Sequence, residues 1–94
     1  MFVLATEVDL FLPECRSLKA KRSIVKSVVE GSRRRFNVAA AEVDHQEKWQ
    51  RAALGFVVVS SSKNHAEEVI DEVERFVWSY PQVQVLGSER RWLE

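Results

Sequence analysis

The chain has 94 residues, of which 46% are apolar and 30% charged, and its 14 basic and 14 acidic side chains cancel. Such a chain makes a single domain, residues 1–94, that buries roughly 60–65% of the surface its unfolded form exposes, so folding requires neither metal nor disulfide. The neutral balance argues against a protein that coats nucleic acid over its whole surface.

The N-terminal segment and the cysteine content indicate the compartment. Glu7 and Asp9 interrupt the first apolar run, and no basic leader precedes it, so we expect neither a signal peptide nor a membrane span. The lone Cys15 cannot form an internal disulfide and has no neighbouring base that would make it a reactive thiol. These features predict a cytoplasmic protein.

The first third of the chain predicts a strand followed by a helix. Residues 2–12 alternate between an apolar face and a mixed face, and Pro13 ends the strand. Ser17 is placed to cap a helix that closes at Asn37, a residue that tolerates the left-handed conformation. The core face of this helix is predicted from residues at helical spacing, namely Leu18, Val25, Val28, Val29, Ser32 and Phe36.

The rest of the chain predicts three more strands and one more helix. Residues 38–43 form a small-residue strand, and residues 52–60 are so apolar that we expect a central strand covered on both faces. Asn64 and Glu67 are spaced as a capping box that opens a helix, which Pro81 stops. A last strand begins at Val83, with a bulge or bend at Gly87 before a polar tail, residues 88–94.

The element order is therefore β-α-β-β-α-β. Two right-handed β-α-β halves in so short a chain predict an α+β fold, a ferredoxin-like sandwich with four antiparallel strands in the order 4-1-3-2 and both helices on one face.

The first helix carries most of the positive charge. From Arg16 to Arg35 there are eight basic residues against one acid, Glu30, so the other residues carry the compensating negative charge. Lys19, Lys26 and Arg33 recur every seven residues and form a stripe, which suits a phosphate backbone but also a merely solvated face. The candidate contacts to RNA or another anion are Lys19, Lys21, Arg22, Lys26, Arg33 and Arg34.

The second helix is acidic, and acids such as Asp71 and Glu74 are expected to pair with the basic helix across the groove between them. Trp78 lies off the apolar stripe of this helix, so it is either a lid over the core edge or a contact for a partner. The open sheet face lacks the aromatic platforms of RNA-recognition motifs and is apolar at its centre, which favours packing against a second copy of the chain as a homodimer.

Only one cluster resembles catalytic machinery. It comprises Glu42, Asp44, His45 and Glu47, but no second histidine lies at ligand spacing, and no nucleophile motif, phosphate loop or cysteine pair occurs. We expect no metal and no cofactor, and we interpret this segment as a loop held by hydrogen bonds and by one buried ring, that of Trp49.

Several segments resemble the YlxP-like family, a bacterial domain of unknown function. They are Ser17-Leu18-Lys19-x-Lys21-Arg22, Arg34-x-Phe36-Asn37-Val38, Ala41-Glu42-Val43-Asp44-His45-Gln46 and Trp49-Gln50-Arg51-Ala52-x-Leu54-Gly55. The resemblance implies a ferredoxin-like fold and a gene among translation and ribosome-maturation genes, but no activity. The chain departs from the family at Ala20, where a glutamate is usual, and at Ser32, where an apolar residue is usual.

The leading functional hypothesis is a non-enzymatic binding module that uses its first helix to contact ribosomal RNA, ribosomal subunits or another polyanion. The alternative is a protein-interaction or assembly domain that acts as a dimer through its sheet face, with the charges only solvating it. A small-ligand regulatory domain ranks third and an enzyme using His45 last.

Overall fold

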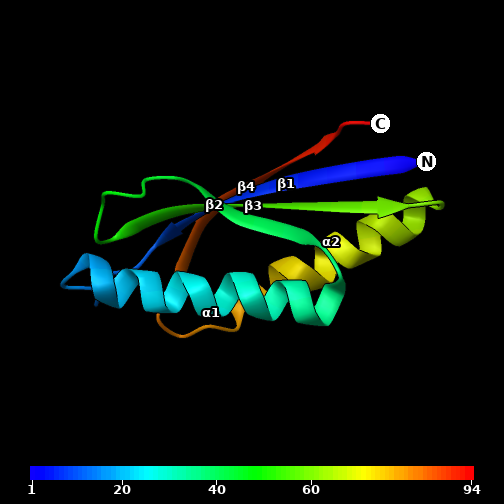
Figure 1. Ribbon diagram of the computed structural model, residues 1–94. Coiled ribbons are helices and arrows are strands. Elements are labelled where there is room, and N and C mark those ends of the chain that lie inside the picture. Colours follow the sequence, from blue (N-terminus) through cyan, green and yellow to red (C-terminus); the bar gives the residue numbers. More distant parts are fainter.

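The computed structural model describes residues 1–94 and contains four strands and two helices. In chain order these are β1 (Phe2–Phe11), α1 (Leu18–Phe36), β2 (Ala39–Asp44), β3 (Arg51–Ser60), α2 (Lys63–Trp78) and β4 (Gln84–Trp92). The strands are antiparallel in the order β2-β3-β1-β4, and both helices lie on one side of the sheet (Figure 1). The predicted order 4-1-3-2 is the same arrangement counted from the other edge, so the predicted ferredoxin-like fold is confirmed.

The core lies between the sheet and the helices. Leu4, Val8 and Leu10 of β1 and Leu54 and Phe56 of β3 point toward the helices, and each is at most 1% exposed. Along each strand these inward-facing residues alternate with outward-facing ones, which explains the apolar alternation seen in the sequence of β1. The central position of β3 is confirmed, but its predicted coverage on both faces is wrong for the single chain because both helices pack on the same side.

The caps of α1 are as predicted. The hydroxyl of Ser17 accepts a hydrogen bond from the Ala20 N–H at 3.0 Å, which satisfies one of the free donors of the first turn. Asn37 closes the helix in the left-handed conformation, with φ 54° and ψ 47°. The start and end of the basic helix are therefore fixed by local chemistry.

The start of α2 differs from the prediction. Ser62, not Asn64, is the N-cap, and its hydroxyl accepts the His65 N–H at 3.3 Å. The predicted capping box is wrong because the helix begins at Lys63, one residue before Asn64. The hydroxyl of Ser62, the residue before the helix, accepts a backbone N–H of the first turn, as the Asn64 amide was expected to do.

The two helices approach closely at Gly31. A Cβ atom at this position would lie 2.7 Å from Cζ of Phe76, closer than atoms in contact allow, so no larger residue fits without a shift. The next residue, Ser32, is fully buried. Its hydroxyl donates a hydrogen bond to the carbonyl of Val28, one turn earlier in the helix, at 2.8 Å. The polar residue at position 32 is therefore compatible with a packed core.

The last strand is longer than predicted. Residues 88–92, expected as a tail, continue β4 along β1. The predicted bulge is confirmed, because Leu10 pairs with Val85 while Asp9 pairs with Gly87, which leaves Leu86 as the extra residue. The chain then ends beside its start, where the Leu93 N–H donates to the carbonyl of Val3.

Candidate functional site

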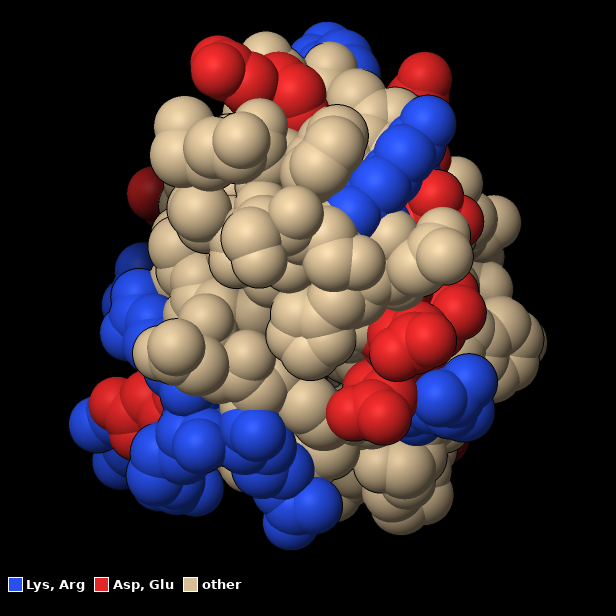
Figure 2. Space-filling view, turned by 90° about the vertical axis from the view of Figure 1, so that its right-hand side faces the viewer, with Lys and Arg blue, Asp and Glu red and all other residues tan.

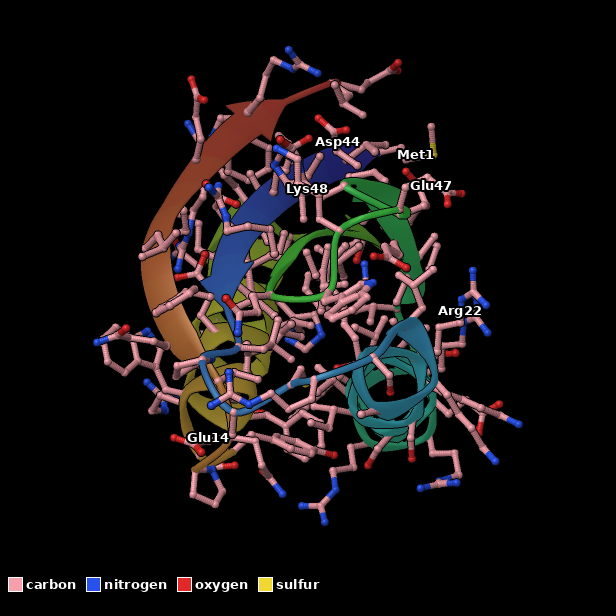
Figure 3. All side chains as sticks on the ribbon, turned by 90° about the vertical axis from the view of Figure 1, so that its left-hand side faces the viewer. Met1, Glu14, Arg22, Asp44, Glu47 and Lys48 are labelled. Atoms are coloured by element: carbon pink, nitrogen blue, oxygen red, sulfur yellow. The ribbon has the colours of Figure 1, made fainter.

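Four basic residues of α1 form the candidate site, which we call the basic flank: Lys19, Arg22, Lys26 and Arg33. All four are exposed, and Figure 3 shows Arg22 directed away from the fold. From Lys19 to Arg33 the flank extends over about 21 Å at the helical rise per residue. The guanidinium of Arg33 also donates to the carbonyl of Ala40, which places this flank of the helix beside the edge strand β2. Arg34 is exposed further round the helix.

Lys21 is not part of the exposed site, so its prediction as an anion contact is wrong. Its side chain is fully buried, and Nζ forms an ion pair with Oε2 of Glu42 at 3.0 Å. The same ammonium donates to the carbonyl oxygens of His45, Gln46 and Arg51 at 2.7, 3.3 and 3.2 Å. These partners satisfy a charge that would otherwise be costly to bury, and they leave it nothing to offer a ligand.

The predicted pairing of basic and acidic helices is also wrong. The side of α1 that meets α2 carries other residues: the hydroxyl of Ser27 bonds to that of Tyr80, Gly31 touches Phe76, and the guanidinium of Arg35 stacks on the Phe76 ring. No ion pair joins the two helices.

The acids of α2 instead bind β4. The guanidinium of Arg90 contacts Oδ1 of Asp71 at 2.6 Å and Oε1 of Glu74 at 2.9 Å. The hydrogen bond that Arg90 donates to Glu74 is the main cause that raises the pKa of Arg90. Glu74 also accepts the hydroxyl of Thr6. Opposite charges consequently gather on different sides of the molecule, basic over α1 and acidic over α2 (Figure 2).

The loop that connects β2 to β3 was the candidate catalytic segment. Nε2 of His45 lies 3.9 Å from Asp9 and Nδ1 lies 3.9 Å from Asp44, while Glu42 is held by Lys21. No group of three or more histidine, cysteine or acidic side chains is arranged to hold a metal ion. The predicted burial of the Trp49 ring is wrong, because 54% of this residue is exposed.

Trp78 is exposed as well, at 65%, so the interpretation as a lid over the core is wrong. It lies near the end of α2, one turn after Glu74. Its role as a partner contact stays a prediction.

The uncovered sheet face divides into an apolar end and an acidic end. At one end, strand pairing places Val3 beside Val59 and Ala5 beside Val57. In the next row Glu7 lies directly opposite Glu89 of β4, two like charges whose repulsion favours a basic group between or above them. The base nearest in register is Arg91, opposite Ala5.

Neither helix is long and apolar enough to cross a membrane.

The chain belongs to a family described as "Protein of unknown function (DUF503)", which matches residues 3–90. It is 30% identical over 86 residues to the uncharacterized protein YlxP of Bacillus subtilis (strain 168), an alignment that covers 92% of this chain and 94% of the relative. The resemblance found in the sequence motifs is thereby confirmed.

The solved structures support the fold. A de novo designed protein with ferredoxin fold, LFR1 1, matches with a TM-score of 0.58 and 13% identity, covering all of this chain and 87% of that one. At this identity the likeness concerns the fold alone.

Proposed function

We propose that the protein is a non-enzymatic binding module whose basic flank contacts the phosphate backbone of RNA. The observation that carries the proposal is that none of the exposed basic side chains of α1 forms an ion pair. The acids that do pair with a lysine or arginine bind Lys21, Arg51 and Arg90, none of which belongs to the flank. A row of free cations at helical pitch suits closely spaced phosphates.

The test is co-sedimentation with purified ribosomal subunits, which present a dense phosphate surface, over a salt series. Four phosphate contacts predict a slope of log affinity against log salt of roughly −3, so affinity falls roughly 60-fold between 50 and 200 mM salt. Lys19→Glu/Lys26→Glu/Arg33→Glu should abolish pelleting. Lys21 is left unchanged because its loss would disturb the fold.

A matched control separates the position of the charge from its amount. Lys63→Glu/Arg75→Glu/Arg91→Glu introduces the same charge change at exposed bases outside α1, none of which forms an ion pair. This variant should retain most of the pelleting, because local phosphate contacts outweigh net charge at moderate salt. Equal loss in both variants, or no pelleting of the wild type at low salt, would refute the proposal.

A second candidate is self-association through the uncovered sheet face. Val59 is 62% exposed there and Val57 only partly covered, in a chain too small to leave such a face open without effect on its solubility. A second copy, related by a twofold axis that runs across the strands, would place its Arg91 over Glu89 of the first copy, and Arg91 of the first copy would lie over Glu89 of the second. These two contacts supply the positive charge that the Glu7–Glu89 row lacks. Sedimentation velocity tests this candidate.

A further inference from the structure

The ring of Trp49 is exposed and has no ring or cation partner within the chain. Trp78 is also exposed without such a partner, at the end of α2. The third tryptophan, Trp92, packs edge-on against Phe2 and lies under Lys63. Exposed indole is costly in water, and its π-face is available to a planar ligand.

The backbone on both sides of Trp49 is held firmly. On one side, the carbonyls of His45 and Gln46 accept hydrogen bonds from the buried ammonium of Lys21. On the other, the side-chain amide of Gln50 donates to the carbonyls of Pro13 and Cys15, each at 3.2 Å, and the Gln50 carbonyl accepts the Leu12 N–H. A ligand that stacked on this ring would therefore not have to order the loop first.

Cations line a depression beside the ring. A shallow depression of about 470 Å³ is lined by Cys15, Arg16, Lys48, Trp49, Gln50 and Arg51. Neither Arg16 nor Lys48 forms an ion pair. The loop and the start of α1 lie at the same end of the molecule (Figures 1 and 3), and Arg16, which lines the depression, precedes the first residue of the basic flank, Lys19, by three positions.

We propose that Trp49 stacks on an unpaired base of single-stranded RNA, whose adjacent phosphates contact Arg16 and Lys48 and whose backbone continues along the basic flank. An aromatic ring beside a cationic track is the arrangement with which proteins bind single strands, since every base has a π-face and every linkage a phosphate. Bases stacked within a duplex cannot reach the ring. This inference rests on the proposed function, because the flank supplies the remaining phosphate contacts.

The experiment measures fluorescence anisotropy with a labelled single-stranded oligouridylate and with an RNA duplex of the same length. Trp49→Ala should weaken single-strand binding roughly 10- to 100-fold, the range of one base stack, and leave duplex affinity and the salt slope unchanged. Trp49→Phe should retain most of the affinity. Trp78→Ala, the matched control at the other partnerless exposed tryptophan, should bind as wild type does.

A second measurement does not depend on the fold of an alanine variant. In Trp78→Phe/Trp92→Phe, Trp49 is the only tryptophan, and saturating oligouridylate should quench its fluorescence while the duplex does not. If Trp49→Ala binds the single strand as wild type does, or the fluorescence is unchanged, the stacking site is refuted. The proposed function still stands in that case, provided that reversal of the basic flank abolishes binding. Absence of any RNA binding at low salt refutes both.

Discussion

The ammonium of Lys21 joins α1 to a segment that follows 21 to 30 residues later, from the end of β2 through the loop to the start of β3. It binds the Glu42 carboxylate of β2 and three carbonyls of the loop and of β3, all from within the core face of α1. Lys21→Met keeps the length of the side chain but leaves these acceptors without their donor. We expect the free energy of unfolding to fall by about 3 kcal/mol, as when a buried ion pair loses one partner. Chemical denaturation measures it.

Lys19→Met is the control for that variant. Lys19 lies two residues earlier on the same helix and is exposed, so its replacement should change stability by no more than about 0.5 kcal/mol. Equal unfolding midpoints for the two variants would show that the hydrogen bonds of Lys21 contribute nothing net.

The Cys15 thiol should be unreactive in the folded protein. The residue is 3% exposed, and burial raises the pKa of the thiol, an effect that the positive charge of Lys21 only partly offsets. Because the thiolate is the reactive form, alkylation near neutral pH should be slower than in guanidinium chloride by roughly two orders of magnitude or more. Mass spectrometry of iodoacetamide-treated protein measures it, and rapid labelling under native conditions would contradict the burial.

The raised pKa of Cys15 also makes the free energy of unfolding depend on pH. The folded chain holds the thiol proton more tightly than the unfolded chain, whose value is near 9.0. This contribution to the free energy of unfolding is therefore fully present below pH 9 and is lost as the pH rises above it.

Single residues were the hardest part to predict from sequence. Lys21 lies three residues after Leu18 and four before Val25, a spacing on the core stripe that indicates burial, but its charge favoured the surface. Trp49 was predicted to be buried because its ring is apolar, but it is exposed. Neither error could be corrected locally, because both positions depend on how the β2–β3 loop folds over α1.

At the scale of elements, the start of α2 depends on one hydroxyl. Ser62→Ala removes the acceptor of the His65 N–H and should lower the free energy of unfolding by about 1 kcal/mol. Asn64→Ala should be neutral or slightly stabilising, because position 64 lies inside the helix, where alanine is favoured. Thermal unfolding of the two variants compares these effects, and a larger loss for Asn64→Ala would support the capping box instead.

The bounds of β1 and α1 were predictable to within one residue. The alternation of β1 and the helical spacing in α1 are both produced by a face that packs against the core, so the pattern and the structure have the same cause. The end of β4 has no such face. Its residues after the bulge are exposed, and pairing with β1 makes them a strand, which their own sequence does not indicate.

At the scale of the whole molecule, the separation of charge follows from the topology. The sequence predicted a basic and an acidic helix, and adjacent antiparallel helices suggested that they would neutralise one another. The structure turns the basic flank toward the edge strand β2 and the acids of α2 toward Arg90 of the opposite edge strand. The order of the strands therefore leaves the exposed cations of α1 without acidic partners, which is the basis for expecting RNA binding.

If the sheet face self-associates as proposed, exchanging the charges of Glu89 and Arg91 should restore a dimer that either single substitution weakens. Glu89→Arg and Arg91→Glu should each weaken the dimer, because each places like charges across the twofold axis. The double variant Glu89→Arg/Arg91→Glu restores opposite charges at both contacts and should dimerise as wild type does. Val59→Asp should weaken the dimer as well, because the same axis places the Val3–Val59 row over the Asp9–Ala53 row of the second copy, where the new carboxylate would meet Asp9. Sedimentation velocity over a concentration series measures all four.

Arg75→Glu serves as the control for this series, since Arg75 lies on α2, on the other side of the sheet, and should leave the association unchanged. The two interactions also respond differently to salt: contacts between apolar residues persist when salt is added, whereas the attraction of Glu89 to Arg91 weakens. A dimer that dissociated completely in high salt would therefore not be held by the Val57–Val59 end. A wild-type protein that stayed monomeric up to about millimolar concentration would exclude an association stronger than about 4 kcal/mol and with it the dimer.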